Sequence, residues 1–389
     1  MLEITPPKEV LTPLKAMEDV FGVVWSSLVD VANFREIWFE GELDNTPYWM
    51  SWEIVSIEGH IHFFARVMSS HRQAVEAALY SYYPDLEIQE VPDYARNVPQ
   101  NIPNEEWNLY GEEFNYTNKP VFPIKTYEKF FEPQGERISA EEKRIDPINS
   151  LLESLSRLGQ GEQYWIQFIT AGVTDHDAPF LKGEAEKAIS KIAKRPEKKA
   201  TKTFIQEAMD QMTLLTVGPT KEQVEGKASR VKIDSETGER EMLLTPGERE
   251  LLTEIENKTR KAIFRTTMRG MYIARKENWK PANRILLRSY MGHFSTNTSR
   301  LREDVGTKTK VHYLFRKRRV FFRARRMMRN AILRFPPYFP DRVKGGALLS
   351  VEELATLIHF PVKITSLAFP TVERVEHRKG GPPPNLPTE

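Results

Sequence analysis

The stretch SWEIVSIEGHIHFFARVM, residues 51–68, decides the fold class. Two runs rich in Ile, Val and Phe stand on either side of the pair Glu58-Gly59. Two apolar runs joined by a short turn that contains Gly are typical of a tight β-hairpin. The chain is therefore expected to form an antiparallel strand pair here.

Helices and strands surround this hairpin. Upstream, Thr12-Pro13 predicts a helix start, with apolar residues at helical spacing as far as Leu28, and a short strand is expected at residues 36–42. Downstream, a helix is expected to begin at Ser69 or Ser70, and the run LEIQEV is the next strand. The order helix, strand, hairpin, helix, strand fits a split β-α-β unit of the ferredoxin-like kind.

A second set of elements follows a similar order. A helix is expected from Asp146-Pro147, followed by the strand EQYWIQFITA. Thr245 and Glu248 have the spacing of a capping box, which predicts a helix to about Arg260, and AIFRTTMRGMYIAR then alternates as a strand. Another helix is expected from Lys280-Pro281 to Phe294. The sequence thus predicts an α+β protein with two split β-α-β (ferredoxin-like) units, a helical insertion and a basic C-terminal region.

The 389 residues are long enough for two or three domains. We expect three parts with different composition. These are 1–135, the first unit with a Pro-rich connection; 136–345, the second unit with a charged helical insertion (175–244) and a basic segment (308–334); and 346–389, a closing helix and strand with a Pro-rich linker.

Three weaker local predictions complete this outline. In the connection, one strand is expected at residues 121–127. In the insertion, a helical pair is expected at 185–194 and 201–215. In the last part, Ser350 and Glu353 form a second capping box, and VKITSLAF is expected to be the closing strand.

The charge of the chain is strongly asymmetric. Residues 1–160 contain 27 Asp and Glu against 13 Lys and Arg, whereas residues 261–344 contain 23 Lys and Arg against 4 Asp and Glu. The densest basic part, KTKVHYLFRKRRVFFRARRMMRNAILR at 308–334, has eleven basic residues and no acid. Three partners fit such a segment: nucleic acid, an anionic membrane surface, or an acidic protein surface such as the first half of the same chain.

This segment supplies the candidate binding residues. The cations expected to contact phosphate or another anionic surface are Arg316, Lys317, Arg318, Arg319, Arg323, Arg325, Arg326 and Arg329. The aromatic residues expected to stack on bases are Tyr313, Phe315, Phe321 and Phe322. Interleaved Arg and aromatic residues are typical of single-strand binding surfaces and also of membrane-surface helices.

The sequence offers no pattern typical of an enzyme. No phosphate loop, G-x-G-x-x-G, G-x-S-x-G or HExxH motif occurs, and Cys is absent. The pair His60 and His62 and the triplet 175–177 lack further ligands at metal-binding spacing, and His359 is expected to be a packed, hydrogen-bonded residue at a helix end. We therefore expect no catalytic, cofactor-binding or metal-binding residues and no cofactor.

Two observations bear on localisation. No run of about 18 apolar residues occurs, so no membrane-spanning helix is expected. The first residues, MLEITPPKEV, have neither a basic nor an apolar region of a secretory signal. The expected location is the cytoplasm, with the basic segment available for peripheral contact with the inner membrane.

Several segments together resemble an uncharacterised bacterial domain family that is found fused to, or beside, type IV secretion and conjugation ATPases of the HerA/FtsK class. The most specific are the hairpin stretch with YPDLEIQEVPDY and the segment EELATLIHFP. The others are PIKTYEKFF, DPINSLLESLSRLGQGEQYWIQ, TPGERELLTEIENKT, MYIAR and the tail GGPPPNLP. These segments span most of the chain.

The resemblance implies a non-catalytic accessory or N-terminal-type domain of a conjugative transfer complex. It implies a separately encoded hexameric HerA/FtsK-like ATPase as partner, with DNA or the anionic inner face of the membrane as further partners. Fused relatives continue into a nucleotide-binding domain and many begin with a membrane segment, and the 389 residues contain neither, so we expect either a stand-alone subunit or a truncated relative of a fused protein. A stand-alone nucleic-acid-binding protein or a peripheral membrane adaptor is the alternative.

Overall fold

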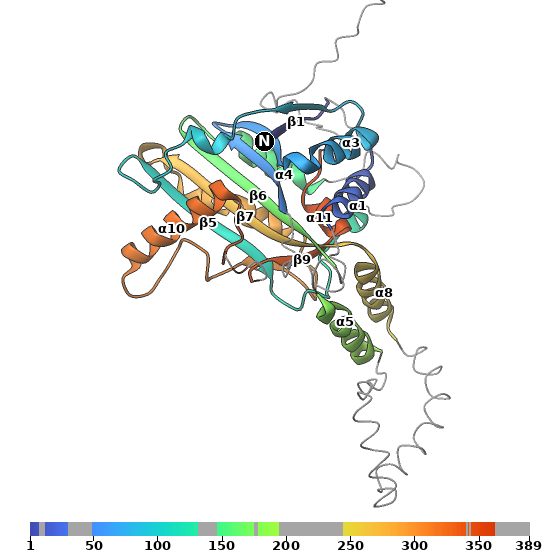
Figure 1. Cartoon of the computed structure of the whole chain (residues 1–389). Helices are drawn as coiled ribbons and strands as arrows, with labels where there is room; N and C mark the ends of the chain where they lie inside the picture. The colour runs from blue at the N-terminus through green and yellow to red at the C-terminus, as the bar shows by residue number, and fades with distance from the viewer. Residues whose placement is uncertain are drawn as a thin grey trace, which may run out of the picture. The chain divides into compact units, whose positions relative to one another are not determined.

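The computed structural model describes residues 1–7, 12–29, 49–130, 146–174, 178–193, 244–339, 341 and 344–361 (Figure 1). Two compact units account for the chain: residues 1–178 together with 261–389, and residues 179–260. The strand predicted at 36–42, the helix at 201–215 and the closing strand at 362–369 lie outside the described residues.

In the described residues of the larger unit, nine strands form one sheet in the order β4-β1-β3-β2-β6-β7-β5-β8, with β9 also paired to β7. Every neighbouring pair is antiparallel. The strands are β1 Leu2–Thr5, β2 Trp49–Ile57, β3 His60–Arg66, β4 Glu87–Glu90, β5 Trp107–Tyr116, β6 Glu162–Val173, β7 Ile263–Arg275, β8 Leu301–Glu303 and β9 Ala347–Ser350. The α+β class is therefore confirmed.

The two halves of the sheet follow the same succession of elements. The first runs β1-α1-β2-β3-α3-β4 and has the strand order β4-β1-β3-β2. The second runs β5-α4-β6, then β7-α9-β8 after the smaller unit, and has the order β6-β7-β5-β8. The second strands of the two halves, β2 and β6, pair along nine residues and join the halves into one sheet.

Local signals placed several elements correctly. The hairpin turns at Glu58-Gly59, where both residues have positive φ, and β2 pairs with β3 on either side of it. The capping box at Ser350 is confirmed. The Ser350 hydroxyl accepts a hydrogen bond from the Glu353 amide, and the Glu353 carboxylate accepts one from the Ser350 amide. The Asp146 side chain caps α4 by accepting from the amide of Ile148.

The strand predicted at residues 121–127 is wrong. This segment forms turns and a short 3-10 helix, and it contains Pro123, which has no amide hydrogen to donate to a sheet. The strand in this region is β5, which pairs with β7. The helix predicted from Lys280 to Phe294 is shorter than expected, since a 3-10 turn, Pro281–Ile285, precedes α9.

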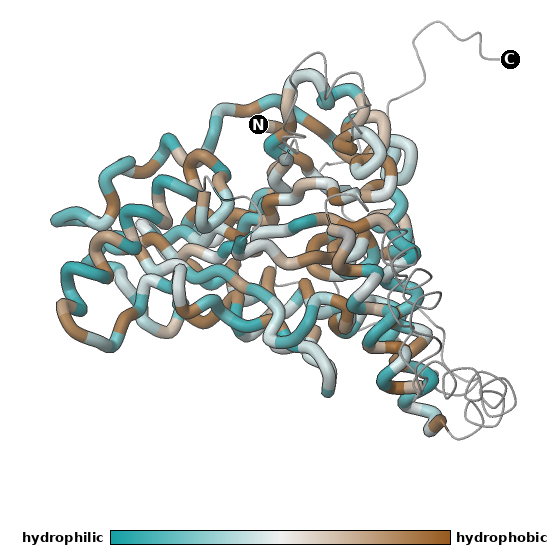
Figure 2. Tube along the Cα trace, turned by 60° about the horizontal axis from the view of Figure 1, so that its bottom comes forward, coloured by the Kyte–Doolittle hydropathy of each residue, from teal (hydrophilic) through white to brown (hydrophobic). Residues whose placement is uncertain are grey.

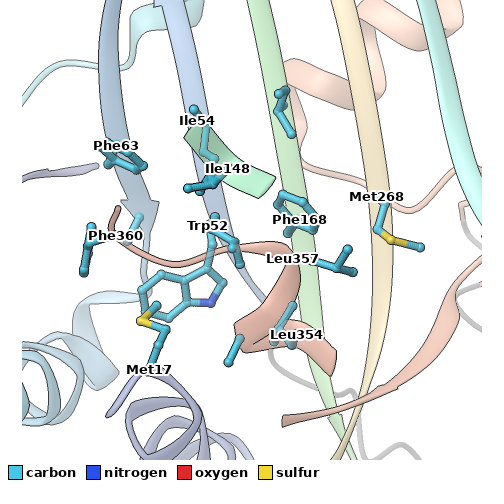
Figure 3. Packing of buried hydrophobic residues seen from close by; sticks show 14 of the residues in the cluster. Met17, Trp52, Ile54, Phe63, Ile148, Phe168, Met268, Leu354, Leu357 and Phe360 are labelled. Carbon is cyan, nitrogen blue, oxygen red and sulfur yellow. The ribbon is translucent and has the colours of Figure 1, made fainter. Parts of the chain in front are cut away.

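Among the described residues of the larger unit, five helices contribute to the core on one face of the sheet. They are α1 Lys15–Leu28, α3 Arg72–Tyr82, α4 Pro147–Ser156, α9 Leu286–Gly292 and α11 Val351–Leu357. Figure 3 shows Met17 of α1 and Leu354 of α11 close to Trp52, which projects from β2. The rings of Phe21 and Trp52 meet edge to face with their centroids 5.2 Å apart.

The other face of the sheet is covered by α10, Arg316–Leu333, and by the 3-10 turn Tyr94–Asn97 (Figure 1). Here α10 comes close to the backbone of β5. A Cβ added to Gly111 would lie 2.8 Å from the side chain of Met327. Gly at this position therefore permits the close approach of the helix.

The smaller unit contains two described helices, α5 Pro179–Ile192 and α8 Pro246–Arg260, which pack against each other. The capping box predicted at Thr245 is confirmed, because the Glu248 carboxylate accepts from the Thr245 amide at 2.8 Å and the Glu248 amide donates to the Thr245 hydroxyl at 3.3 Å. The first helix of the predicted pair begins at residue 179 instead of 185.

Candidate nucleic-acid interface

All eight predicted cations lie on α10. One side of this helix is apolar and buried, and its members follow the i, i+3, i+4 spacing of a helix face. They are Ala324, Met327, Met328 and Ala331, which pack with Trp165, Met271 and other residues on the sheet. The cations belong to the remaining sides and to the first turns, where the helix extends beyond its buried contacts.

The structure brings most of the predicted cations to the surface. Six are exposed: Arg316, Lys317, Arg318, Arg319, Arg326 and Arg329. Arg323 and Arg325 are half-buried. Arg323 donates through Nη1 to the carbonyls of Val305 and Lys308 at 2.9 and 2.8 Å, and Arg326 donates to the carbonyl of Pro337 at 2.7 Å. These two therefore also fix α10 against the preceding and following loops.

The four predicted aromatic residues are exposed beside these cations. Phe315 is 69% exposed, Phe322 58% and Tyr313 53%, and Phe321 is exposed as well. Three guanidinium groups lie over their rings: Arg318 over Phe322, Arg325 over Phe321 and Arg319 over Tyr313, at 5.7, 5.0 and 5.8 Å from the centroids. Figure 2 shows hydrophilic and hydrophobic residues interleaved along the described parts of the chain as a whole. Flat rings and flat cations thus share one surface, which we call the Arg–aromatic tip (residues 313–322).

The start of α10 concentrates positive charge. Phe315 precedes the helix with φ 58°, and no side chain caps the first turn. That turn carries four successive cations, Arg316 to Arg319, and no acid. A helix N-terminus is already the positive end of the helix dipole, so cations there are unfavourable and a bound anion relieves the repulsion.

Among the described residues, none of the eight cations forms an ion pair with an acid. The acids of the first half use other partners. Glu113 pairs with Arg269 at 2.6 Å, Glu112 with Arg288 at 2.9 Å, and Glu162 with Lys280 at 2.7 Å. One of the three alternatives was that the basic segment pairs with the acidic first half of the same chain. Among the described residues, Arg334 of this segment forms such pairs, with Glu53 and Asp93, whereas the cations of the tip form none.

Arg334, directly after α10, is completely buried and anchors the helix to the sheet. Its Nε donates to Glu53 Oε1 at 3.0 Å and its Nη2 to Glu53 Oε2 at 3.2 Å. The same guanidinium binds both carboxylate oxygens of Asp93 at 2.5 and 2.9 Å. Tyr94 and Ser51 donate their hydroxyls to Glu53. Charge-assisted pairs of this kind hold the end of α10 in one position.

A row of polar side chains that begins at Glu53 crosses four neighbouring strands of the sheet. Glu53 on β2 is in register with Gln167 on β6, Gln167 with Arg269 on β7, and Arg269 with Glu113 on β5. Gln167 donates to the carbonyl of Ala331 at 3.2 Å, and Arg269 donates to the carbonyl of Phe335 at 2.7 Å. The C-terminal end of α10 is therefore fixed by buried hydrogen bonds, while its N-terminal end is exposed.

Electrostatics support this anchor. Burial opposes the positive charge of Arg334, but Glu53, Tyr94 and Asp93 outweigh it and raise the pKa of Arg334 further above its ordinary value. Burial also opposes the charge of Asp93, yet the adjacent Arg334 guanidinium lowers the pKa of Asp93 below its ordinary value. The pair is charged at neutral pH.

Sequence reasoning missed this anchor. Arg334 was counted in the basic segment but was assigned no role, and Glu53 and Asp93 were not recognised as its partner acids. A signal was present, because a single acid inside an apolar strand run such as SWEIVSI must be paired if that strand is buried.

The remaining candidates have structural surroundings. His62 contacts Glu3 at 2.7 Å, and His60 is exposed. The prediction for His359 is confirmed, since it is buried and bonded to the Ala355 carbonyl and to Asp146. The triplet 175–177 lies outside the described residues. In the described part of the chain, no group of three or more potential ligands is arranged to hold a metal ion.

Two further findings complete the description of the interface. No described helix has both the length and the apolar character needed to cross a membrane. No protein-family model matches the chain, nor does any curated protein. The functional interpretation therefore depends on the geometry of α10 and its anchor.

Proposed function

We propose that the protein binds nucleic acid through the Arg–aromatic tip, as a non-catalytic accessory domain of a type IV secretion-like (conjugative transfer) ATPase complex. The observation that carries the proposal is the tip itself: successive exposed cations, without acid partners in the described part of the chain, interleaved with exposed rings. Cations neutralise phosphates and release counterions, and exposed rings stack on unpaired bases.

The length of the tip fits a short phosphate track. The helical part of the tip, residues 316–322, extends about 10 Å at 1.5 Å per residue. Phosphates of one strand of B-DNA are spaced about 3.4 Å along the axis, so the tip reaches about three or four of them. The anchor at Arg334 supports this role, because a helix fixed at one end presents its other end with little loss of conformational entropy on binding.

The fold is compatible with an accessory domain. We interpret the two halves of the sheet as two split β-α-β units of the ferredoxin-like kind, an interpretation supported by their strand orders. The partner we propose is a separately encoded hexameric HerA/FtsK-like ATPase, on the basis of the sequence segments quoted above. The proposed location is the cytoplasm, at the inner face of the membrane when the complex is assembled.

A salt series tests the binding proposal. We would measure the anisotropy of fluorescent single- and double-stranded DNA with the unaltered chain and with a variant in which Arg316, Lys317, Arg318 and Arg319 are Gln. The slope of log K against log salt is negative, and each lost phosphate contact reduces its magnitude by about 0.7 for single strands and about 0.9 for duplex, so four lost contacts reduce it by about 3.

The matched control replaces four exposed cations elsewhere with Gln, namely Lys15, Arg157, Lys276 and Arg300. This control has the same net charge as the tip variant. We expect it to keep most of the affinity and slope of the unaltered chain. Equal losses in the two variants would show that only net charge matters, and no binding of DNA at low salt would overturn the proposal.

A membrane surface is the second candidate, favoured by one specific observation. Leu314 is 74% exposed and lies between Tyr313 and Phe315 at the start of the tip. Apolar residues next to cations are typical of segments that lie on anionic lipid. Sedimentation with vesicles containing anionic lipid, but not with neutral vesicles, is the expected result, and equal behaviour with both would exclude an electrostatic membrane site.

The ATPase partner requires a separate test. If the chain is an accessory domain, it should co-purify in fixed stoichiometry with a separately encoded HerA/FtsK-like ATPase. The tip variant with four Gln residues should keep this association, because we assign the tip to nucleic acid. Absence of association at micromolar concentrations would contradict the accessory role without affecting the DNA-binding proposal.

A further inference from the structure

The side of α10 that faces away from the sheet carries a ring between cations. An α-helix turns by about 100° per residue, so residues two positions apart lie almost on opposite sides of it. Phe322 is two positions before Ala324, which is completely buried against the sheet, and Phe322 itself is 58% exposed. Arg318 and Arg329, four residues before and seven after Phe322, lie on the same side and are exposed. We call Arg318, Phe322 and Arg329 the outer ridge of α10.

The rings of the tip are accessible although guanidinium groups lie beside them. Arg318 lies over Phe322 and Arg319 over Tyr313, at 5.7 and 5.8 Å from the ring centroids, yet Tyr313 is still 53% exposed. Phe321 and Phe322 meet edge to face, with their centroids 5.6 Å apart and 74° between their planes. Two rings at this angle cannot lie flat on the same partner, so they require separate flat partners.

A base-paired duplex is a poor partner for the outer ridge. Cations alone would favour a duplex, because its phosphates are more closely spaced than those of a single strand. The faces of paired bases are covered by their neighbours, and the groove edges are bound mainly by hydrogen-bonding side chains. Phe322, in the middle of the ridge, has no hydrogen-bonding group. In a groove the exposed rings would therefore lie against polar edges without a partner to stack on.

We propose that the Arg–aromatic tip selects single-stranded over double-stranded nucleic acid, by stacking unpaired bases on Tyr313 and Phe322 while the adjacent cations bind phosphate. The inference rests on the proposed function and names its substrate class. A stacked base removes the ring from water, and the guanidinium beside the ring adds a cation–π contribution. The cations thus provide an affinity that both polymers share, and the rings provide the preference for unpaired bases.

A ring variant tests the protein side of this contact. It replaces Tyr313 and Phe322 with Leu, which keeps an apolar side chain and the net charge but has no aromatic face. At the lower end of the range for base stacking, each lost ring weakens single-strand binding about fivefold, so two weaken it about 25-fold. Duplex binding should change by less than about twofold, because the phosphate contacts remain.

The matched control replaces Tyr80 and Phe180 with Leu. These two rings are 42% and 47% exposed and lie outside the tip. The control therefore loses one Tyr and one Phe from the surface, as the ring variant does. We expect it to bind single strands and duplex as the unaltered chain does.

Base removal tests the same contact from the ligand side. The probes are a fluorescent 15-mer of thymidine, the same strand with abasic sites at its centre, and the duplex of the thymidine strand with its complement, compared at one salt concentration by anisotropy. The abasic strand keeps every phosphate. The unaltered chain should bind the thymidine strand about tenfold tighter than the duplex and about 25-fold tighter than the abasic strand. The ring variant should bind the thymidine and abasic strands equally.

The outcomes separate this inference from the proposed function. Loss of the base and loss of the rings should weaken binding by the same factor, alone or together, if the two are in contact. Additive losses, a loss no larger than that of the control, or a duplex bound as tightly as the thymidine strand would overturn the inference and leave phosphate binding intact. Should the ring variant fail to fold, equal binding of thymidine and abasic strands by the unaltered chain would overturn it. Absence of binding to every strand at low salt would overturn the proposed function as well. A uridine 15-mer in the same series distinguishes RNA from DNA as the source of the strand.

Discussion

Replacing Arg334 with Met should destabilise the protein strongly. Arg334 is completely buried and forms two hydrogen bonds with Glu53, at 3.0 and 3.2 Å, and two with Asp93. The Met side chain fills similar volume but leaves Glu53, which is also fully buried, without a cation. Breaking a buried ion pair from one side costs about 3–5 kcal/mol. Because Asp93 is partly exposed, we expect a loss near 3 kcal/mol.

Arg329→Met is the matched control. Arg329 lies on α10, five residues before Arg334, is exposed, and has no ion pair among the described residues. Surface substitutions of this kind change stability by less than about 0.5 kcal/mol. Equilibrium urea denaturation followed by circular dichroism gives the free energy of unfolding of both variants and of the unaltered chain.

The difference between the two variants tests the anchor directly. If Arg334→Met and Arg329→Met lose the same free energy of unfolding, within about 0.5 kcal/mol, Arg334 is not an anchor. A loss below about 1 kcal/mol for Arg334→Met would likewise refute the reasoning, because it would mean that Glu53 finds water or another donor when the guanidinium is removed.

Three further predictions follow from named contacts. The neighbouring Asp146 outweighs the effect of burial and raises the pKa of His359. The stability that His359 contributes should therefore be present below pH 6.5 and lost as pH rises through its raised pKa. The difference in free energy of unfolding between the unaltered chain and His359→Gln, measured by urea denaturation, should narrow from pH 5.5 to 8.5, and a constant difference would contradict the assignment. Gly111→Ala should lower the free energy of unfolding by about 1 kcal/mol, because the added methyl group overpacks against the flexible side chain of Met327. The urea midpoint should fall accordingly, and an unchanged midpoint would mean that α10 lies further from β5. Ser350→Ala should cost about 1 kcal/mol by removing the cap of α11, and a thermal midpoint equal to that of the unaltered chain would show that the cap is dispensable.

Local sequence signals predicted much of the larger unit, because its hairpin and caps depend on neighbouring residues. Glu58-Gly59, Asp146 and Ser350 each fix the backbone within a few positions of themselves. Elements that depend on distant partners were missed. β1, at Leu2–Thr5, is only four residues long and pairs with β3 and β4.

The strand β5 shows why some buried strands escape sequence reasoning. The adjacent acids Glu112 and Glu113 interrupt its apolar pattern, yet both are buried because Arg288 and Arg269 pair with them across more than 150 residues. The joining of the halves through β2 and β6 is likewise a long-range pairing. A pattern read along one strand contains no information about such partners.

The candidate interface was predicted in composition but not in geometry. The run from Arg316 to Arg329 identified a basic surface, and the structure exposes most of it. Sequence alone did not predict the buried role of Arg334, since that role arises where the backbone leaves the helix at Arg334, with φ 55°. A hollow beside α10, lined by Glu113, Thr307 and Arg326, was also not predictable from the sequence, because these residues come from a strand, a loop and a helix far apart in the chain.

The central claim is that nucleic acid lies on the Arg–aromatic tip, and photochemical cross-linking tests it most directly. Single-stranded DNA carrying iodouracil would be irradiated with the full chain, and the cross-linked residues would be mapped by mass spectrometry. Stacking on the exposed rings predicts cross-links at Tyr313, Phe321 or Phe322, with yields that fall as salt rises. Cross-links confined to residues outside 313–329, at the same yield in the variant with four Gln residues, would contradict the claim.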